Sequence, residues 1–435
     1  MVIVSDISTP RLHYVLDYVF NMRLGIGYSL QTEQTDAAEP TIFYTTELQT
    51  GKFSIPSSGL LSESDVWQFV PDLKFDGNLP IIFSDNSGAT FKFDIFAAVF
   101  WMLSRYEEYL PFLPDAHGRF TAVESFSGRN GLLENPIVDR WILLFRTKLQ
   151  QFFPELELKS EVFEFQPTID VDSPWSYRHK GIGRNVGGLL RDVLKFDFHS
   201  VLERLLVLAH LKSDPFYTFD YIAEIHKDTP VKFFVLTARH GRFDKSINPK
   251  KRAFKHFLSK LAAKNDVGLH PSYAASQNEQ KFASELQDFQ QITNSECHTS
   301  RQHFLRVVLP EYYCMLNNLK ISVDYSFGYA DNAGFRAGTS RPFKFYDLLN
   351  EQTLNVVIQP LIAMDVTLRN YMNLTPEQAT QKLNYYADVI KQTNGLFTTL
   401  WHNQHFLQRG KWQPWDAVYL NLLSSVKPKE TFPKS

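Results

Sequence analysis

From about residue 161, the chain alternates short apolar runs typical of β-strands with amphipathic stretches typical of helices. The strand-like runs are VFEFQPTIDV, VKFFVLTA, DVGLH, CHTS, ISVDYSFGY, GFRAG, TLNVVIQP and GLFTTLWH. Helical patterns separate many of them, near 199–212, 251–264, 278–291, 311–318, 376–393 and 414–424. This alternation is typical of parallel α/β architecture. So many strands favour a distorted (β/α) barrel, closed or partly open, over a short doubly wound sheet.

The first 155 residues have a different pattern, which predicts a smaller α+β domain. Helices are expected near 10–23, 94–109 and 136–153, with strand-like runs TIFYTTEL and PIIFS between them. A chain of 435 residues is long for one hydrophobic core. We therefore expect two domains, at 1–155 and 161–425. The residues of the first do not select among capping a cleft, recruiting a partner and mediating dimerisation.

Charge and composition exclude several function classes. The net charge is −2 and there is no basic tract, so we expect no nucleic-acid partner. Two cysteines, Cys297 and Cys314, form neither a disulfide framework nor a zinc motif. The first 20 residues lack a signal-peptide pattern, and the apolar run at 94–104 is too short to span a bilayer. These features predict a cytoplasmic protein without a membrane span. They leave the oligomeric state open.

Polar residues follow several of the predicted strands, at the ends where β/α barrels carry their chemistry. Alone, each has an ordinary explanation as a solvated turn, a helix cap or a surface ion pair. Together they offer a carboxylate and two imidazoles for a divalent metal, a second carboxylate as general base, and a histidine as general acid. The set is Asp170, Asp172, His270, His303, Arg336 and His402.

The stretches PTIDVD, GLHPS, GFRAGTSRP and LFTTLWHN resemble the successive motifs of NodB-like polysaccharide deacetylases, carbohydrate esterase family 4. The resemblance covers about residues 161–425. Residues 1–155 look like the uncharacterised domain that precedes the deacetylase part in one variant of that family. The resemblance implies a NodB-type distorted barrel that binds Zn²⁺, or Ni, Co or Fe, and hydrolyses N-acetyl groups of amino sugars.

By position in these motifs, the resemblance assigns Asp170 as the general base and Asp172 as a metal ligand. It also makes His270 a ligand, Arg336 the group that orients the base, and His402 the general acid. This would explain how the carboxylates of Asp170 and Asp172 can lie close together despite the repulsion between their charges. A cation neutralises one, and an arginine holds the other.

One position departs from the family pattern, which has a second histidine four residues after the first. Here that position is Ala274, so the third ligand must come from elsewhere. His303 follows the next predicted strand and is our candidate, with His298 as the alternative. Trp175, Tyr273 and Trp401 are candidates to line a sugar cleft, although ordinary packing explains them equally well.

The sequence thus predicts a metal-dependent hydrolase that removes N-acetyl groups from an amino sugar or a surface-polysaccharide precursor. Two alternatives stay open. One is a catalytically degenerate carbohydrate-binding protein on the same barrel. The other is a C–N hydrolase that acts on a non-sugar amide.

Overall fold

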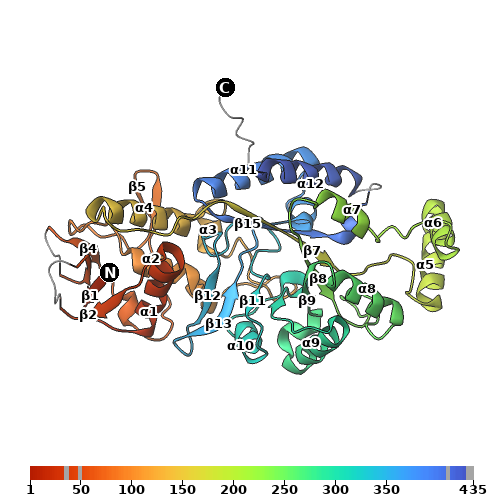
Figure 1. Ribbon diagram of the computed structural model, residues 1–435, viewed down its shortest axis with the longest axis horizontal. Coiled ribbons are helices and arrows are strands. Elements are labelled where there is room, and N and C mark those ends of the chain that lie inside the picture. Colours follow the sequence, from red (N-terminus) through yellow and green to blue (C-terminus); the bar gives the residue numbers. More distant parts are fainter. Residues whose placement is uncertain (34–38, 48–50, 408–411, 428–435) are drawn as a thin grey trace. The chain divides into compact units, whose positions relative to one another are not determined.

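The computed structural model describes residues 1–33, 39–47, 51–407 and 412–427 (Figure 1). The chain divides into two compact units. Unit 1 contains Met1–Glu164, Arg306–Ile362 and Asp388–Phe397, and unit 2 contains Phe165–Leu305, Ala363–Ala387 and Thr398–Ser435. Each unit is therefore built from separate stretches of sequence. The predicted domains 1–155 and 161–425 follow a simpler division and stay a prediction.

Unit 1 begins with a parallel sheet in the order β2-β1-β3-β4. Its elements up to residue 164 are β1 (Val2–Ser5), α1 (Pro10–Leu16), a π-helix (Asp17–Leu24), β2 (Ser29–Gln31), β3 (Thr41–Thr45), β4 (Phe53–Pro56), β5 (Lys74–Asp76), β6 (Leu79–Ile81), α2 (Ile95–Leu103), α3 (Phe126–Arg129) and α4 (Ile137–Phe152). The three helices expected from the sequence appear as α1 with its π-helical extension, α2, and α4.

Helix α2 is part of the apolar core of unit 1. All nine of its residues are buried, and it lies within the helix expected near 94–109. Asp94 caps its first turn by accepting a hydrogen bond from the backbone N–H of Ala97, at 2.9 Å. Across the described parts of the chain, we find no helix with the length and apolar character needed to cross a membrane.

A second part of unit 1 contains α10 (Glu311–Asn318) and the strands β11 (Val323–Asp324), β12 (Phe343–Asp347) and β13 (Gln352–Ile358), in the order β12-β13-β11. The run GFRAG is not a strand, and this prediction was wrong. Residues 334–338 form a turn in which Gly334 and Gly338 have positive φ angles, a region that glycine enters without steric cost.

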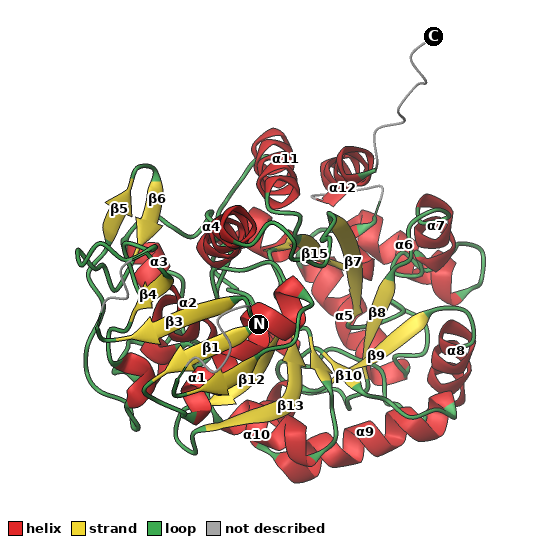
Figure 2. Cartoon of the chain, turned by 60° about the vertical axis from the view of Figure 1, so that its left-hand side comes forward, coloured by secondary structure: helices red, strands yellow, loops and turns green. Residues whose placement is uncertain are grey.

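In unit 2 the strands lie in the order β10-β9-β8-β7-β15-β14. Figure 2 shows β7, β8 and β9 side by side. The elements are β7 (Glu164–Val171), α5 (Ile182–Leu194), α6 (Phe198–Leu208), α7 (Phe219–Ile225), β8 (Lys232–Leu236), α8 (Arg252–Ala262), β9 (Asp266–His270), α9 (Glu279–Thr293), β10 (Thr299–Ser300), β14 (Ala363–Met364), α11 (Pro376–Gln392), β15 (Leu396–His402) and α12 (Gln413–Val426).

The parallel register brings the predicted site residues to one edge of this sheet. Asp170 is opposite Phe234, His270 is opposite Leu236, and Leu269 pairs with Ser300. The carboxyl ends of β7, β8, β9 and β10 therefore meet, as they do in α/β proteins that bind ligands there. The fold is a mixed α/β fold with parallel sheets. Among the described residues, no strand closes this row into a barrel.

Candidate metal centre

Three of the predicted ligands lie together at the carboxyl ends of the strands. The Nε2 atom of His270 is 3.5 Å from Oδ1 of Asp172, and the Nε2 atom of His303 is 3.6 Å from the same oxygen. Two ligands ~2.1 Å from a tetrahedral ion stand about 3.4 Å apart. The spacing of the three atoms therefore suits one small divalent ion.

The hydrogen bonding of these atoms supports the same fit. Oδ1 of Asp172 and Nε2 of His270 are buried, and neither atom has a hydrogen-bond partner of normal geometry among the described residues. A buried polar atom without a partner costs on the order of 1–3 kcal/mol, so two beside each other need an explanation. A cation bound by both atoms would satisfy them.

The outer nitrogen of each imidazole is already engaged. Nδ1 of His270 donates to the backbone carbonyl of Arg301, and Nδ1 of His303 lies 2.9 Å from Oδ1 of Asp244. These contacts fix the rings and direct both Nε2 lone pairs toward Asp172. Carboxylates and carbonyls behind metal-binding histidines commonly play this role.

The electrostatics of the group also favour a cation. Burial would raise the pKa of Asp172, but the imidazoles of His270, His303 and His402 hold that pKa well below its usual range. Burial would lower the pKa of His270, yet the nearby carboxylates of Asp170 and Asp172 raise it. The two carboxylates thus stabilise positive charge between them.

Asp170 is held by an arginine, although not by the predicted one. Nη1 of Arg301 donates to Oδ1 of Asp170 at 2.9 Å, and both side chains are buried. Arg336 lies in unit 1, where its Nε donates to Oε1 of Glu108 at 2.9 Å. The role of orienting Asp170, which the resemblance implied for Arg336, thus fits Arg301, whose guanidinium donates to this carboxylate.

His402 ends β15 and has its two ring nitrogens in different surroundings. Nδ1 lies 2.8 Å from Oδ1 of Asp365, while Nε2 lies 4.0 Å from Oδ2 of Asp172. Burial would lower the pKa of His402, but the charge of Asp365 and the hydrogen bond to it raise this pKa to about 10. His402 can therefore carry a proton at neutral pH on a nitrogen that faces the ligand group.

Asp365, His402 and His405 form a second group whose atoms are close enough to bind a metal. Here, however, the carboxylate is already saturated. Oδ2 of Asp365 accepts from Nδ1 of His405 at 2.6 Å and from the backbone N–H of His402 at 2.8 Å, and Oδ1 faces His402. We therefore interpret this group as one that holds His402 in place and not as a second metal site.

The backbone directly after His303 has an uncommon left-handed conformation. Phe304 and Leu305 follow His303 with φ angles of 66° and 51°, the left-handed region that costs roughly 1–2 kcal/mol per residue outside glycine. Such strain is common where a side chain is aimed into a functional site. His298, the alternative ligand, is exposed and contacts Glu296 at 3.1 Å. It is not part of either metal-binding group.

Three residues of this region were not identified from the sequence. Arg301 stands two residues before His303 in SRQHF, so its proximity could have been read from the same strand end. Asp365 follows the short strand β14, and Asp244 lies in a loop after β8. No local pattern marks either acid as part of a site.

Of the three aromatic candidates, Tyr273 is connected to the ligand group through Asp244. Its backbone N–H donates to Oδ1 of Asp244 at 2.8 Å, and its ring stacks on Phe243 with centroids 4.1 Å apart. Trp401 is fully buried and packs on Tyr419, and Trp175 packs on Phe257. Both tryptophans are thus part of the core.

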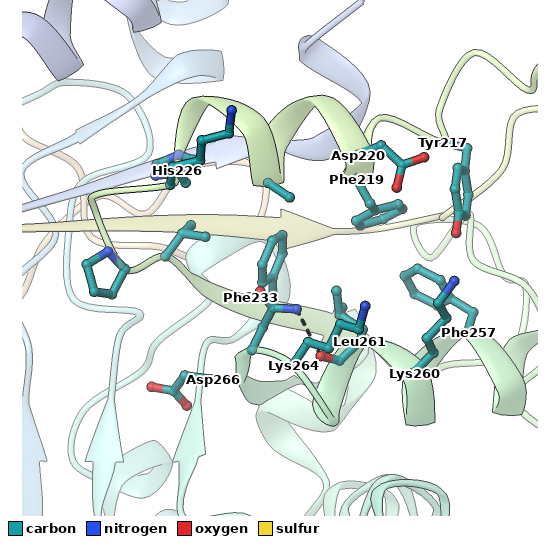
Figure 3. Close-up of a pocket in the computed structure, with 15 residues that line it drawn as sticks. Tyr217, Phe219, Asp220, His226, Phe233, Phe257, Lys260, Leu261, Lys264 and Asp266 are labelled. Carbon is teal, nitrogen blue, oxygen red and sulfur yellow. Dashed lines mark hydrogen bonds between the residues drawn. The ribbon is translucent and has the colours of Figure 1, made fainter.

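A pocket of about 510 Å³ lies elsewhere in unit 2 (Figure 3). Its lining includes Phe219 of α7, Phe257 of α8 and Asp266, the first residue of β9. It is therefore near the amino ends of β8 and β9, whereas the ligand group lies at their carboxyl ends. Open α/β sheets carry their sites at the carboxyl ends, so we do not place the function in this pocket.

Comparison with known proteins gives a family match for the first part of the chain only. Residues 1–154 match a family model described as a family of unknown function, DUF7033. No curated protein matches.

Three solved structures resemble parts of the chain weakly. A presumed polysaccharide deacetylase from Mycobacterium smegmatis is 10% identical over 62% of this chain and 85% of its own, with a TM-score of 0.40. A 4-alpha-glucanotransferase from Thermococcus litoralis is 12% identical over 62% and 37%, with a TM-score of 0.36. A mutant CE4 family pseudoenzyme with restored enzymatic activity is 11% identical over 63% and 77%, with a TM-score of 0.27. Likenesses this weak carry no argument about activity.

Proposed function

We propose that this protein is a metal-dependent hydrolase that removes N-acetyl groups from an amino sugar or a surface-polysaccharide precursor. The observation that carries the proposal is the pair of unsatisfied buried atoms, Oδ1 of Asp172 and Nε2 of His270, beside the imidazole of His303. The motif resemblance supports the choice of reaction, and a NodB-type barrel left open at one side is the fold that we infer for residues 161–425.

Asp172, His270 and His303 would hold the ion, with zinc as the first candidate for this set of one oxygen and two nitrogens. When bound, a divalent ion supplies polarisation of the amide carbonyl and lowers the pKa of a neighbouring water. Asp244 and the carbonyl of Arg301 hold the two rings in place. In the neutral form of each ring, these contacts place the proton on Nδ1 and leave the lone pair on Nε2.

Asp170 and His402 would perform the proton transfers. Arg301 fixes one oxygen of Asp170, and the other oxygen lies 3.6 Å from Nε2 of His270, where it can accept a proton from the attacking water. His402 would then donate the proton on its Nε2 to the departing amine. Asp365 keeps His402 protonated before this step by holding its Nδ1.

Metal content tests the first half of the proposal. Purified wild-type protein should contain close to one equivalent of zinc, nickel, cobalt or iron by elemental mass spectrometry. Asp172→Asn and His303→Ala should each lose most of it, whereas His298→Ala, at an exposed histidine just before β10, should keep it. An absence of metal in the wild type after incubation with excess ions would contradict a working hydrolase. A degenerate carbohydrate-binding protein would then be the better reading.

Activity tests the second half. Release of acetate from N-acetylated amino sugars and their oligomers should require the metal, and Asp170→Asn should abolish it while the ion stays bound. A panel of cyclic amides and formamides serves as the comparison. Turnover of those compounds alone would replace the sugar substrate with a non-sugar C–N bond and leave the metal centre unchanged.

A further inference from the structure

Helices α5 and α6 form an antiparallel hairpin joined by three residues (Figure 1). Its distribution of polarity is the reverse of that in an ordinary surface hairpin. The side chains buried between the helices include Asp192, Glu203 and Arg204, whereas large apolar side chains face outward. Charged residues are almost never buried in this way unless they are paired.

The buried polar side chains are well paired, and this fixes which face of each helix points inward. Nη2 of Arg204 donates to Oδ2 of Asp192 at 2.6 Å, and its guanidinium stacks on the ring of Tyr177 at 4.6 Å. Tyr177 in turn donates to Glu203 at 3.2 Å. Turning either helix to bury its apolar stripe would break this network and leave charges unpaired.

The outward sides of both helices carry large exposed apolar side chains. On α5, Ile182, Leu190 and Leu194 are 85%, 59% and 78% exposed and recur at a spacing that places them on one side of the helix. On α6, Phe198 and Leu202 are 63% and 58% exposed. Soluble monomers rarely leave so many large apolar side chains together in water.

The tip of the hairpin is apolar as well. Phe196, in the turn between the helices, is 79% exposed, and it lies beside Phe198 with ring centroids 6.4 Å apart. Two exposed phenylalanines at a turn are well placed to enter an apolar phase first.

Exposed charges around this face are mainly positive. Residues 178–214 contain seven lysines and arginines and four acidic residues, a balance of +3 in a chain of net charge −2. Two of the acids, Asp192 and Glu203, are buried in ion pairs. Arg191 and Lys212, the exposed partners of these two acids, and Lys195 face the water. Asp197 is the exposed acid at the tip, so the exposed charges of the rim are mainly positive.

We propose that the α5–α6 hairpin docks on an anionic lipid surface, with its apolar face in the headgroup region. An amphipathic helical surface with a basic rim is complementary to such a bilayer. A second copy of the same hairpin would bring like charges together and offers no such complementarity. This inference is independent of the proposed hydrolase activity.

Co-sedimentation of the full chain with vesicles tests the proposal. Phosphatidylcholine vesicles with added phosphatidylglycerol should bind the wild type at least about tenfold more strongly than phosphatidylcholine alone, since each cation near an anionic surface contributes about fivefold. The double variant Phe196→Ser, Phe198→Ser should lose at least about tenfold in binding. Lys195→Glu should lose at least about fivefold.

The matched control is Leu113→Ser, Val123→Ser, which removes two apolar side chains that are 77% and 69% exposed outside the hairpin. It should bind vesicles as the wild type does. All five substituted positions are exposed, so thermal unfolding should be nearly unchanged and loss of binding cannot be attributed to misfolding.

Two outcomes would overturn the proposal. One is vesicle binding that is absent in the wild type or unaffected by the Phe196→Ser, Phe198→Ser change. The other is a dimer in light scattering that this double variant converts to a monomer, without vesicle binding. That result would assign the face to a second copy of the chain.

Discussion

Asp244 contacts the candidate ligand His303 and not the ion position itself, and it shows how far the site extends beyond the ligands. Burial would raise the pKa of Asp244, but the hydrogen bond from His303 lowers it, so the carboxylate stays ionised against the imidazole. The Asp244→Asn variant keeps the shape and removes the charge. We expect its metal affinity to fall about 10–100-fold, as outer-shell changes typically do.

Competition with a chelator of known affinity measures this change. Asp220→Asn, an exposed aspartate at the start of α7, should leave the affinity unchanged. Equal affinities of Asp244→Asn and the wild type would mean that the ring of His303 needs no such support.

His226 provides a pH-dependent contribution to stability far from the ligand group. Burial lowers its pKa from the usual 6.5 to about 4, and Nε2 lies 2.8 Å from the hydroxyl of Tyr419. Between these pH values the unfolded chain takes up a proton that the folded chain does not. The free energy of unfolding should therefore fall as the pH drops from 6.5 toward 4, by up to about 1.4 kcal/mol per pH unit from this group.

Urea denaturation of the wild type and His226→Gln at several pH values isolates the effect. The difference between the two proteins should shrink as the pH falls, because only the wild type has this histidine to protonate. His256→Gln, at an exposed position on α8, should follow the wild-type curve. A constant difference across the range would show that His226 is protonated in the folded state.

Strand β9 is tightly packed between its neighbours where it approaches the candidate site. A Cβ atom on Gly268 would lie 2.6 Å from Cε1 of Phe234 and 2.7 Å from Oγ1 of Thr299. Gly268→Ala should therefore force β9 away from its neighbours β8 and β10 and shift His270, two residues later. We expect a loss of about 1–3 kcal/mol in the free energy of unfolding, together with weaker metal binding.

Gly187→Ala is the matched control, since nothing lies within 4 Å of a Cβ atom at that position in α5. It should be neutral or stabilising by up to about 1 kcal/mol, because alanine favours a helix over glycine. Thermal unfolding of the two variants gives the comparison, and equal stabilities would mean that β9 adjusts without cost.

The elements also show what the sequence could and could not predict. Long periodic patterns gave α4, α8, α9 and α11 nearly at their observed bounds. Helix α5 was not predicted, and its sequence contains three glycines, a residue that disfavours helix formation. At the site, strand ends in the sequence predicted Asp172, His270 and His303, and Arg301 stands at the same strand end as His303. Asp244, by contrast, depends on a contact between distant loops.

Taken whole, the molecule interleaves its two units along the chain, and this bears on the predicted boundary near residues 155–161. Residues 306–362 belong to unit 1 and not to the unit that holds the candidate metal centre. Within unit 1, Arg336 pairs with Glu108, and Asp139 accepts from Thr339 at 2.6 Å and from the backbone N–H of Ser340 at 2.8 Å. All of these groups are buried.

A fragment of residues 161–435 would therefore lose Glu108, the partner of the buried Arg336, and Asp139, which accepts hydrogen bonds from Thr339 and Ser340. Removing one partner of a buried ion pair costs about 3–5 kcal/mol, a large share of the stability of a typical domain. We expect the fragment to unfold without a sharp transition in circular dichroism and to be cleaved by protease within 306–362. The full chain carrying Glu108→Gln measures how much of this loss belongs to the single pair. A fragment that unfolds cooperatively at the temperature of the full chain would instead establish 161–435 as an independent domain, as the sequence pattern predicts.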